Sequence, residues 1–278
     1  MTNSKVPTPH PDSGIIDLSE VNLTYDPAFS VALENNPTLA KAILIPILKR
    51  NDFEVKSVRT QALTIALYGH SITFDCLIEF SDGTYCNLEM QKAKAGMPFE
   101  RMIYHRALLM ARYSLEKGED KFKNLKPTIV VVLLDDDLTE EGLPLYRYSY
   151  RAEHSGEDLE PGQGIYVVNL RIKDASTELG RLMEDISASN PNEVHNPVFS
   201  DVLGMLKSEK GIKLMSDYRE RMSEELREEW YAKGLEQGKR DTLLSLYRDG
   251  LVTLEDAVKC LGISTEDFLK LIQDQGNK

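Results

Sequence analysis

The sequence predicts an α/β fold in which helices flank a central mixed β-sheet and a helical extension follows at the C-terminus. Apolar and polar residues alternate along two short segments within residues 71–91, which predicts a β-hairpin. An uninterrupted apolar, β-branched run over residues 128–134 predicts a central strand buried on both faces. After residue 174 the pattern becomes helical, so helices alone follow the mixed part of the chain.

The N-terminal part of the chain predicts a tail and two helices before the sheet begins. Residues 1–16 are rich in Pro, Ser, Thr and Asp, which predicts a disordered tail. A short element is expected at residues 27–34 and a helix at 37–49, where Pro46 is expected to bend or end the helix. We place the core domain at residues 17–174.

The predicted hairpin places acidic and amide side chains on one face of its second strand. Asn87, Glu89 and Gln91 alternate with apolar residues there and share a face, because side chains repeat every second residue along a strand. The turn Ser81-Asp82-Gly83 fits a three-residue loop in which the glycine supplies the left-handed conformation. In the first strand the alternation groups Phe74 with Cys76 and Ile78 on one face.

The length of this turn decides which residues oppose each other. With a three-residue loop Phe80 faces Thr84, and counting back along both strands brings Asp75 opposite Glu89. A two-residue loop would instead bring Asp75 opposite Met90 and separate the two carboxylates. We adopt the three-residue loop because it gives the more coherent chemistry.

Two carboxylates that face each other destabilise a sheet unless a cation or a proton joins them. Their oxygen atoms favour a hard cation, Mg²⁺ or Mn²⁺, and the pattern points to phosphodiester cleavage. The three cysteines and five histidines show no spacing typical of zinc ligands. A metal site and a solvated, slightly strained sheet face are the two interpretations of Asp75 and Glu89.

A helix is expected at residues 98–116, with Gly118 as its C-terminal cap. Arg101, His105 and Arg112 fall on one stripe of this helix. They form either a basic edge that contacts phosphate or an ordinary solvated face, and Tyr104 is either a site residue or a packed aromatic. Further strands are expected at residues 145–151 and 165–170.

The C-terminal part divides into a helical extension at residues 175–241 and a small helical module at 242–278. Helices are expected at residues 177–187, 197–208 and 211–241; Gly234 and Gly238 weaken the last one. Its apolar stripe fits packing against the core or a homodimer contact and consists of Met215, Tyr218, Met222, Leu226 and Trp230. The small module resembles a helix-turn-helix, but its last helix is acidic, which favours protein contact over DNA contact.

Composition and charge limit the function further. The net charge is −12, but residues 41–127 carry 14 Lys and Arg against 10 Asp and Glu, whereas residues 135–160 carry 9 acids against two arginines. The expected core is therefore mildly basic, which predicts weak, salt-sensitive binding of nucleic acid. No apolar run approaches the roughly 20 residues that span a bilayer. The absence of a signal pattern and the few cysteines predict a cytoplasmic protein.

Several segments resemble the PD-(D/E)XK nuclease superfamily, and in particular the transposase-associated branch that includes the recombination-promoting nucleases. The resemblance runs from about residue 25 to the C-terminal end and is carried by Tyr25-Asp26-Pro27-Ala28-Phe29, Asp75, Asn87-Leu88-Glu89-Met90-Gln91, Arg101-Met102-Ile103-Tyr104, and Gly118 with Pro127-Thr128-Ile129-Val130. It implies a restriction-endonuclease-like core.

The resemblance also implies roles for individual residues. Asp75 and Glu89 would bind Mg²⁺, with Mn²⁺ as the alternative, together with the main-chain carbonyl of Met90. Gln91 stands where the superfamily more often has lysine and would position the attacking water without supplying charge. The nucleic-acid contacts would come from Arg101, Tyr104 and His105. Glu54 lies where many such nucleases have an additional helix carboxylate, but we interpret it as a surface glutamate.

The function implied by this resemblance is a cytoplasmic, Mg²⁺-dependent DNA endonuclease tied to transposition or recombination. Its partners would be DNA and a second copy of the chain, with no membrane. The alternative is a nuclease fold that cleaves weakly or not at all and acts as a nucleic-acid-binding or protein-interaction module. The absence of a lysine at Gln91 and the overall acidic charge favour this alternative.

Overall fold

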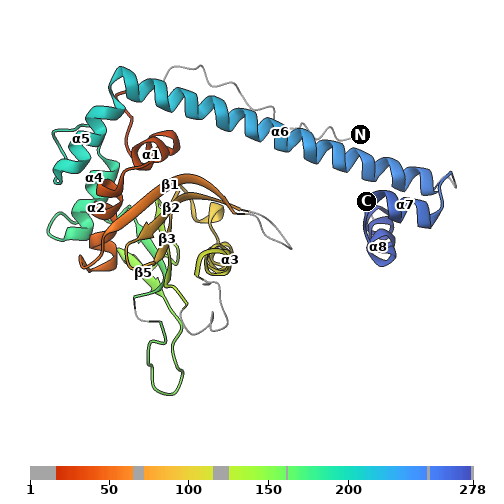
Figure 1. Cartoon of the computed structure of the whole chain (residues 1–278), viewed down its shortest axis with the longest axis horizontal. Coiled ribbons are helices and arrows are strands. Elements are labelled where there is room, and N and C mark those ends of the chain that lie inside the picture. The colour runs from red at the N-terminus through yellow and green to blue at the C-terminus, as the bar shows by residue number, and fades with distance from the viewer. Residues whose placement is uncertain (1–16, 65–71, 115–124, 161, 249–250, 277–278) are drawn as a thin grey trace. The chain divides into compact units, whose positions relative to one another are not determined.

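A six-stranded mixed β-sheet organises the first of two units in the computed structural model, which describes residues 17–64, 72–114, 125–160, 162–248 and 251–276 (Figure 1). The first unit extends to Tyr218 and the second begins at Arg219. The strands are β1 (Val55–Thr64), β2 (Ile72–Phe80), β3 (Tyr85–Gln91), β4 (Thr128–Leu134), β5 (Leu145–Tyr148) and β6 (Gly164–Asn169). Both the α/β fold and the mixed sheet are as predicted.

The strand order is β1-β2-β3-β4-β6-β5. The pairs β1–β2, β2–β3 and β5–β6 are antiparallel, whereas β4 runs parallel to both β3 and β6. The parallel strand β4 lies in the middle and every one of its residues is buried, as its continuous apolar run predicts. The hairpin β2–β3 therefore lies between β1 and the buried strand β4.

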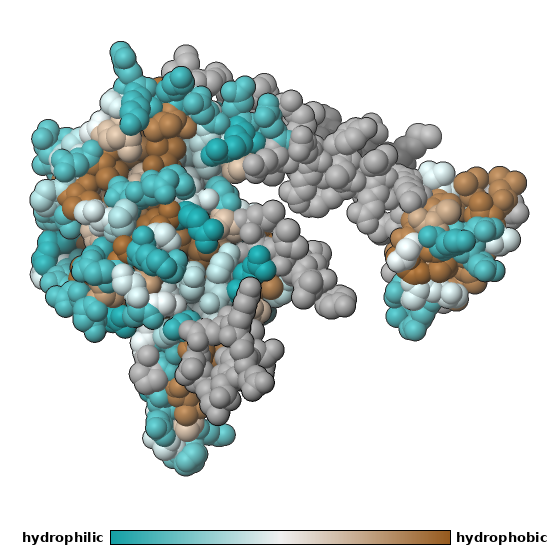
Figure 2. Space-filling view, viewed as in Figure 1, coloured by the Kyte–Doolittle hydropathy of each residue, from teal (hydrophilic) through white to brown (hydrophobic). Residues whose placement is uncertain are grey.

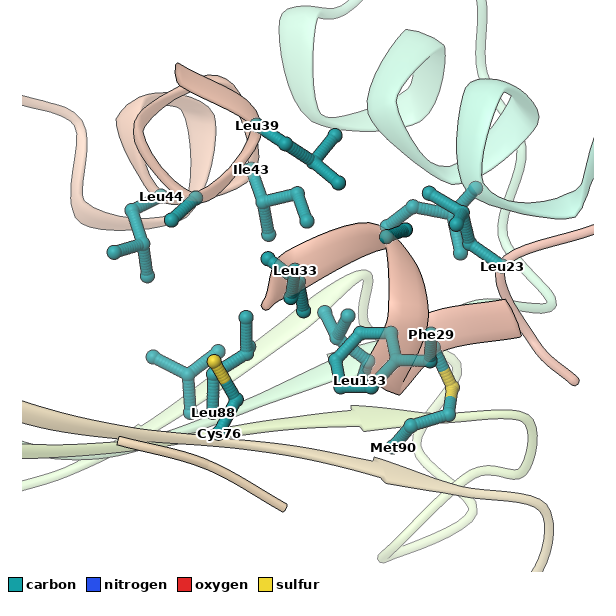
Figure 3. Close-up of a cluster of buried hydrophobic side chains, with 14 of the residues drawn as sticks. Leu23, Phe29, Leu33, Leu39, Ile43, Leu44, Cys76, Leu88, Met90 and Leu133 are labelled. Carbon is teal, nitrogen blue, oxygen red and sulfur yellow. The ribbon is translucent and has the colours of Figure 1, made fainter. Parts of the chain in front are cut away.

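Four helices cover one face of the sheet (Figures 1 and 3). They are α1 (Asp26–Leu33), α2 (Pro37–Leu48), α4 (Glu178–Ser187) and α5 (Pro197–Leu206). Their apolar side chains meet those of the sheet in one large cluster, in which Phe29 and Leu33 of α1 lie above Leu88 and Met90 of β3. Pro46 lies inside α2, so it does not end that helix.

The other face of the sheet is covered by α3 (Phe99–Leu109), which continues as a π-helical turn over Met110–Ser114. Met97 and Met102 contact alternate residues of β4 and β6 there. Because successive strand residues point to opposite faces, β4 supplies both clusters. The predicted cap Gly118 lies outside the described residues.

The regular alternation of β2 is interrupted at Asp75. Phe74 packs with Leu77 on the α3 face, whereas Cys76 belongs to the cluster on the opposite face. The prediction that Phe74 shares a face with Cys76 and Ile78 is therefore wrong. The cause lies in β1: Gln61 stands between the partners of Phe74 and Cys76 and has φ +50°, which breaks the regular pleat opposite Asp75.

The helices after residue 174 belong to the first unit as far as Tyr218. Residues of α4 and α5 lie in the large cluster, so the boundary expected at residue 174 falls inside one packed unit. Helix α6 (Glu209–Arg248) runs continuously through Gly234 and Gly238. A cost of about 1 kcal/mol for each glycine weakens a helix without necessarily ending it.

The second unit contains α6 from Arg219 onward, α7 (Leu254–Leu261) and α8 (Thr265–Gly276). Leu244, Ala257 and Phe268 form its small core. Thr253 caps α7, and Gly262 ends it in the left-handed conformation. Polar residues cover much of the visible face of both units, with apolar patches between them (Figure 2). None of the described helices is long and apolar enough to cross a membrane.

The first two members of the apolar stripe of α6 pack inside the first unit. Met215 lies in the large cluster and Tyr218 is buried. Met222 is half-buried, and the side chains of Leu226 and Trp230 lie outside the described ones. Packing against the core is thus confirmed for the first two members, and a homodimer contact through the C-terminal helices stays a prediction.

Candidate active site

The β2–β3 turn has the predicted three-residue geometry. Phe80 N–H donates to the carbonyl of Thr84 at 2.8 Å, and Gly83 N–H donates back to the carbonyl of Phe80 at 3.0 Å. Gly83 has φ +86°, a conformation in which a side chain would be strained. Asp82 completes the turn by accepting from Thr84 N–H at 2.8 Å.

The turn sets the register that brings the two carboxylates together. The ladder pairs Glu79 with Tyr85 and ends at Cys76 with Leu88, so the next residues along are Asp75 and Glu89. Asp75 N–H donates to Oε1 of Glu89 at 3.3 Å, and Met90 N–H donates to Oδ2 of Asp75 at 3.2 Å. Each carboxylate thus accepts a backbone hydrogen bond from the other strand, and the predicted register is confirmed.

The surroundings shift the pKa values of the two carboxylates in opposite directions. Burial, and then the charge of Glu89, raise the pKa of Asp75 well above its usual range. Burial alone would also raise the pKa of Glu89, but hydrogen bonds from His105, Asn87 and the Asp75 N–H lower it below its usual value. The surroundings of the pair thus favour the charged form of Glu89 more than that of Asp75.

His105 supports the charged Glu89 from α3. Its Nδ1 lies 3.3 Å from Oε1 of Glu89, and its Nε2 accepts from Nε of Arg101 at 3.3 Å. Because an arginine can only donate, Nε2 is the acceptor in this contact, and the tautomer that accepts there has its proton on Nδ1, which faces Oε1 of Glu89 and lies 3.2 Å from Nδ2 of Asn87. Asn87 adds a bond from Nδ2 to the same Oε1 at 2.8 Å.

The position of His105 corrects its predicted role. The stripe of Arg101, His105 and Arg112 predicted an exposed basic edge, but His105 is 0% exposed and buried behind Glu89. A ring without accessible surface has no contact to offer to nucleic acid. The charge pattern of the helix could not show this, because Glu89, the partner of His105, lies on strand β3 and not on the helix.

Gln91 lies two residues beyond Glu89 on the same face of β3 and is half-buried. Its Oε1 would be 2.9 Å from a Cβ atom on Gly96, so the absence of a side chain at Gly96 makes room for the Gln91 carboxamide. Gly96 belongs to the short 3-10 turn η1 (Lys94–Gly96), and its carbonyl accepts from Nη1 of Arg101 at 2.8 Å.

Arg101 thus connects the two halves of the site. One nitrogen contacts His105, which supports Glu89, and another holds the turn that surrounds Gln91. The residue itself is exposed, and these bonds use two of its five N–H groups. Tyr104, the other aromatic candidate on this helix, is half-buried.

Asp26 is a third carboxylate near the pair, and no role was predicted for it. It begins α1, on the opposite side of the sheet from α3, and is exposed. Although the residue as a whole is exposed, burial around its carboxylate, and then the charge of Glu89, raise the pKa of Asp26. The charge of Asp26 in turn contributes to the raised pKa of Asp75. The segment Tyr25-Asp26-Pro27-Ala28-Phe29, already part of the resemblance, carried the only signal for it.

Glu54 does not take this place. It lies before β1 rather than on a helix, and its exposed carboxylate is paired with Nζ of Lys41 at 2.6 Å. The interpretation as a surface glutamate is confirmed. The site therefore draws its side chains from β2, β3 and α3, with Asp26 of α1 close by.

The donors at the Asp75–Glu89 pair fit a hard divalent cation. Oε1 of Glu89 is occupied by several donors, whereas its Oε2 is buried and has no hydrogen-bond partner among the described residues. A buried, charged oxygen without a donor is costly, and a cation would satisfy it. Within the described ranges, however, no three acidic, His or Cys side chains converge closely enough to form a complete metal site. A cation here would need main-chain or water ligands as well.

Comparison with known proteins identifies one family. Residues 32–246 match the family described as PD-(D/E)XK nuclease family transposase. The matched range contains the sheet, α3 and the residues of the β2–β3 hairpin. No curated protein and no solved structure matched the chain.

Proposed function

We propose that this chain, which belongs to the PD-(D/E)XK nuclease family of transposases, is a metal-dependent DNA endonuclease that acts in transposition or recombination. The observation that carries the proposal is the meeting of Asp75 and Glu89 across the hairpin, with Gln91 on the same face as Glu89. Membership in a nuclease family supports phosphodiester hydrolysis, and the link to transposases supports DNA as the substrate.

Asp75, Glu89 and the main-chain carbonyl of Met90 would hold the cation, with Mg²⁺ expected and Mn²⁺ as the alternative. When bound, the cation supplies the charge that lowers the pKa of water and neutralises the phosphate. The raised pKa of Asp75 is consistent with this role, because a bound cation would favour the charged form of its carboxylate.

The remaining residues orient and support these groups. His105 and Asn87 both contact Oε1 of Glu89, which favours the charged form of this carboxylate. Its Oε2 has no donor among the described residues and would face the cation. The Gln91 carboxamide can both donate to and accept from water, which suits a group that positions a nucleophile. The exposed Arg101 is suited to contact phosphate, and Tyr104 of the same helix to contact the nucleic acid beside it.

Plasmid nicking in Mg²⁺ tests the proposal. Asp75→Ala and Glu89→Gln should each reduce the nicking rate about 100-fold or more, because each removes a ligand of the cation. Glu79→Gln is the matched control: it changes an acid of the same strand, paired with Lys56 at 2.6 Å at the other end of the hairpin. Equal rates for wild type and Asp75→Ala would refute the proposed function.

A second function is binding without cleavage, and the observation that favours it is the uncharged Gln91 in the place of a lysine. Calorimetry with Mn²⁺ separates the two functions. Metal binding that Glu89→Gln weakens, together with measurable nicking, supports the endonuclease. Binding of DNA by wild type without any nicking in Mg²⁺ or Mn²⁺ supports the binding module.

A further inference from the structure

The hydroxyl of Tyr218 joins Asp26 of α1 to Gln61, which lies across from Asp75 in β1. Tyr218 is in the part of α6 that belongs to the first unit and is 4% exposed. Its hydroxyl donates to Oδ2 of Asp26 at 3.1 Å and accepts from Nε2 of Gln61 at 3.0 Å. A buried tyrosine normally finds one partner for its hydroxyl, whereas this one connects two side chains from different elements.

Both partners of Tyr218 stand next to the carboxylate pair. Gln61 lies in β1 across from Asp75, and its φ of +50° marks the break in the pleat at that position. Asp26 lies at the start of α1, and electrostatic coupling links it to both Asp75 and Glu89. Helix α1, strand β1 and helix α6 therefore meet at the Tyr218 hydroxyl, whereas His105 approaches the pair from α3.

We propose that Tyr218 is a positioning residue that fixes Asp26 beside the Asp75–Glu89 pair, so that the Asp26 carboxylate strengthens binding of the divalent cation from outside the ligand set. The inference rests on the proposed function of the pair. Because no three acidic side chains of the described chain converge on one ligand position, Asp26 acts through its charge or through a water molecule. Mg²⁺ suits such an arrangement, since it keeps several of its waters when bound to protein.

If the Tyr218 hydroxyl only helped to pack α6 against the core, a different result would be expected. Removing it would then lower the stability of the fold but leave the affinity for metal unchanged. A hydroxyl that orients Asp26 predicts that metal affinity falls and that excess metal restores activity. The two roles are thus separated by the dependence of the nicking rate on the concentration of metal.

The experiment compares Tyr218→Phe, Asp26→Asn and the double variant in the full chain. Mn²⁺ affinity is measured by calorimetry, and nicking is measured over a range of Mg²⁺ concentrations. We expect each single variant to bind Mn²⁺ about 3- to 10-fold more weakly, less than the 10- to 100-fold typical of a residue that touches a ligand directly. The maximal nicking rate of Tyr218→Phe should approach that of wild type at high Mg²⁺.

Tyr166→Phe is the matched control. It also removes the hydroxyl of a buried tyrosine, one that accepts from Nε of Arg147 at 3.1 Å at the β6–β5 edge of the sheet. This variant should bind Mn²⁺ as wild type does. Thermal unfolding of the metal-free variants shows whether Tyr218→Phe remains folded.

The double variant tests whether Tyr218 acts through Asp26. If it does, the double variant should bind Mn²⁺ no more weakly than Asp26→Asn alone, because the tyrosine has lost the group that it positions. Additive losses would overturn the positioning role, and so would a folded Tyr218→Phe with wild-type Mn²⁺ affinity and Mg²⁺ dependence. In either case a loss of nicking in Asp75→Ala would leave the proposed function intact. A wild type that neither binds Mn²⁺ nor nicks DNA would overturn both.

Discussion

Nδ1 of His105 lies 3.3 Å from Oε1 of Glu89, and the side chains are 0% and 1% exposed. A charged carboxylate at this depth requires donors, and His105 supplies one from helix α3, which covers the face of the sheet to which Glu89 points. The helix thus contributes to the lowered pKa of Glu89. Together with the burial of Asp75, this contact explains why the pKa of Glu89 is lowered while the pKa of Asp75 is raised.

The first prediction concerns this contact. His105→Ala should weaken Mn²⁺ binding about 10- to 100-fold, as is typical when a residue that orients a ligand is lost. The physical reason is that Glu89 loses a donor and takes up a proton more readily, so the cation must displace it. Calorimetric titration with Mn²⁺ at pH 7 measures the effect.

His154→Ala serves as the control for this prediction because His154 is exposed on the loop after β5. It should leave the Mn²⁺ affinity unchanged. His105→Gln retains a donor and should recover part of the loss. An unchanged affinity in a folded His105→Ala would show that Glu89 does not depend on the histidine.

The second prediction concerns the stability of the metal-free protein. The pKa of Asp75 is raised in the folded state, so folding takes up a proton and the stability that this group contributes is present at low pH. That contribution is lost as the pH rises from about 4, the pKa of an unfolded aspartate, through the raised pKa. Asp75→Asn cannot ionise and should therefore melt at a higher temperature than wild type near pH 8.

Differential scanning calorimetry in EDTA tests this expectation. The difference in Tm should be a few degrees at pH 8, at about 2–4 °C for each kcal/mol, and should shrink toward pH 4. Adding Mn²⁺ should reverse the order, because metal binding stabilises only the wild type. A Tm difference that does not change with pH would contradict the raised pKa.

The register of the site could be predicted from the sequence because it depends on local features. A three-residue turn with a glycine at the left-handed position fixes which residues of β2 and β3 oppose each other, and Asp75 meets Glu89 as a result. The central strand β4 was equally evident, since its six consecutive apolar residues after Thr128 favour burial on both faces.

The contacts that complete the site could not be predicted in this way. Tyr218 and Asp26 are separated by 192 positions, and no periodicity links a tyrosine on a late helix to an early aspartate. His105 was assigned to an exposed stripe because its helical spacing from Arg101 suggested a shared surface. Burial of one member of that stripe depends on how α3 crosses β3, which is a property of the packed sheet.

The third prediction concerns the missing lysine. Gln91→Ala should slow nicking about tenfold or more, because it removes the carboxamide that is proposed to position the attacking water. Gln91→Lys should hold or exceed the wild-type rate, since it supplies a charge near the phosphate. A rate for Gln91→Lys below that of Gln91→Ala in plasmid nicking would show that the carboxamide itself is required.

The fourth prediction uses the contact between Gln91 and Gly96. A methyl group at Gly96 would lie 2.9 Å from Oε1 of Gln91, which is closer than two such atoms approach. The carboxamide is the far end of a flexible side chain, so it can move away at little cost in stability. Gly96→Ala should therefore leave Tm nearly unchanged but slow nicking by about the same factor as Gln91→Ala.

Two further variants make this last test specific. Gly204→Ala adds the same methyl group at a position in α5 with nothing within 4 Å, and it should nick DNA at the wild-type rate. Gln91→Ala combined with Gly96→Ala should be no slower than Gln91→Ala alone, because the side chain that would be displaced is absent. A wild-type nicking rate for Gly96→Ala, in a protein where Gln91→Ala is slow, would mean that the position of the carboxamide is less restricted than its contact with η1 indicates.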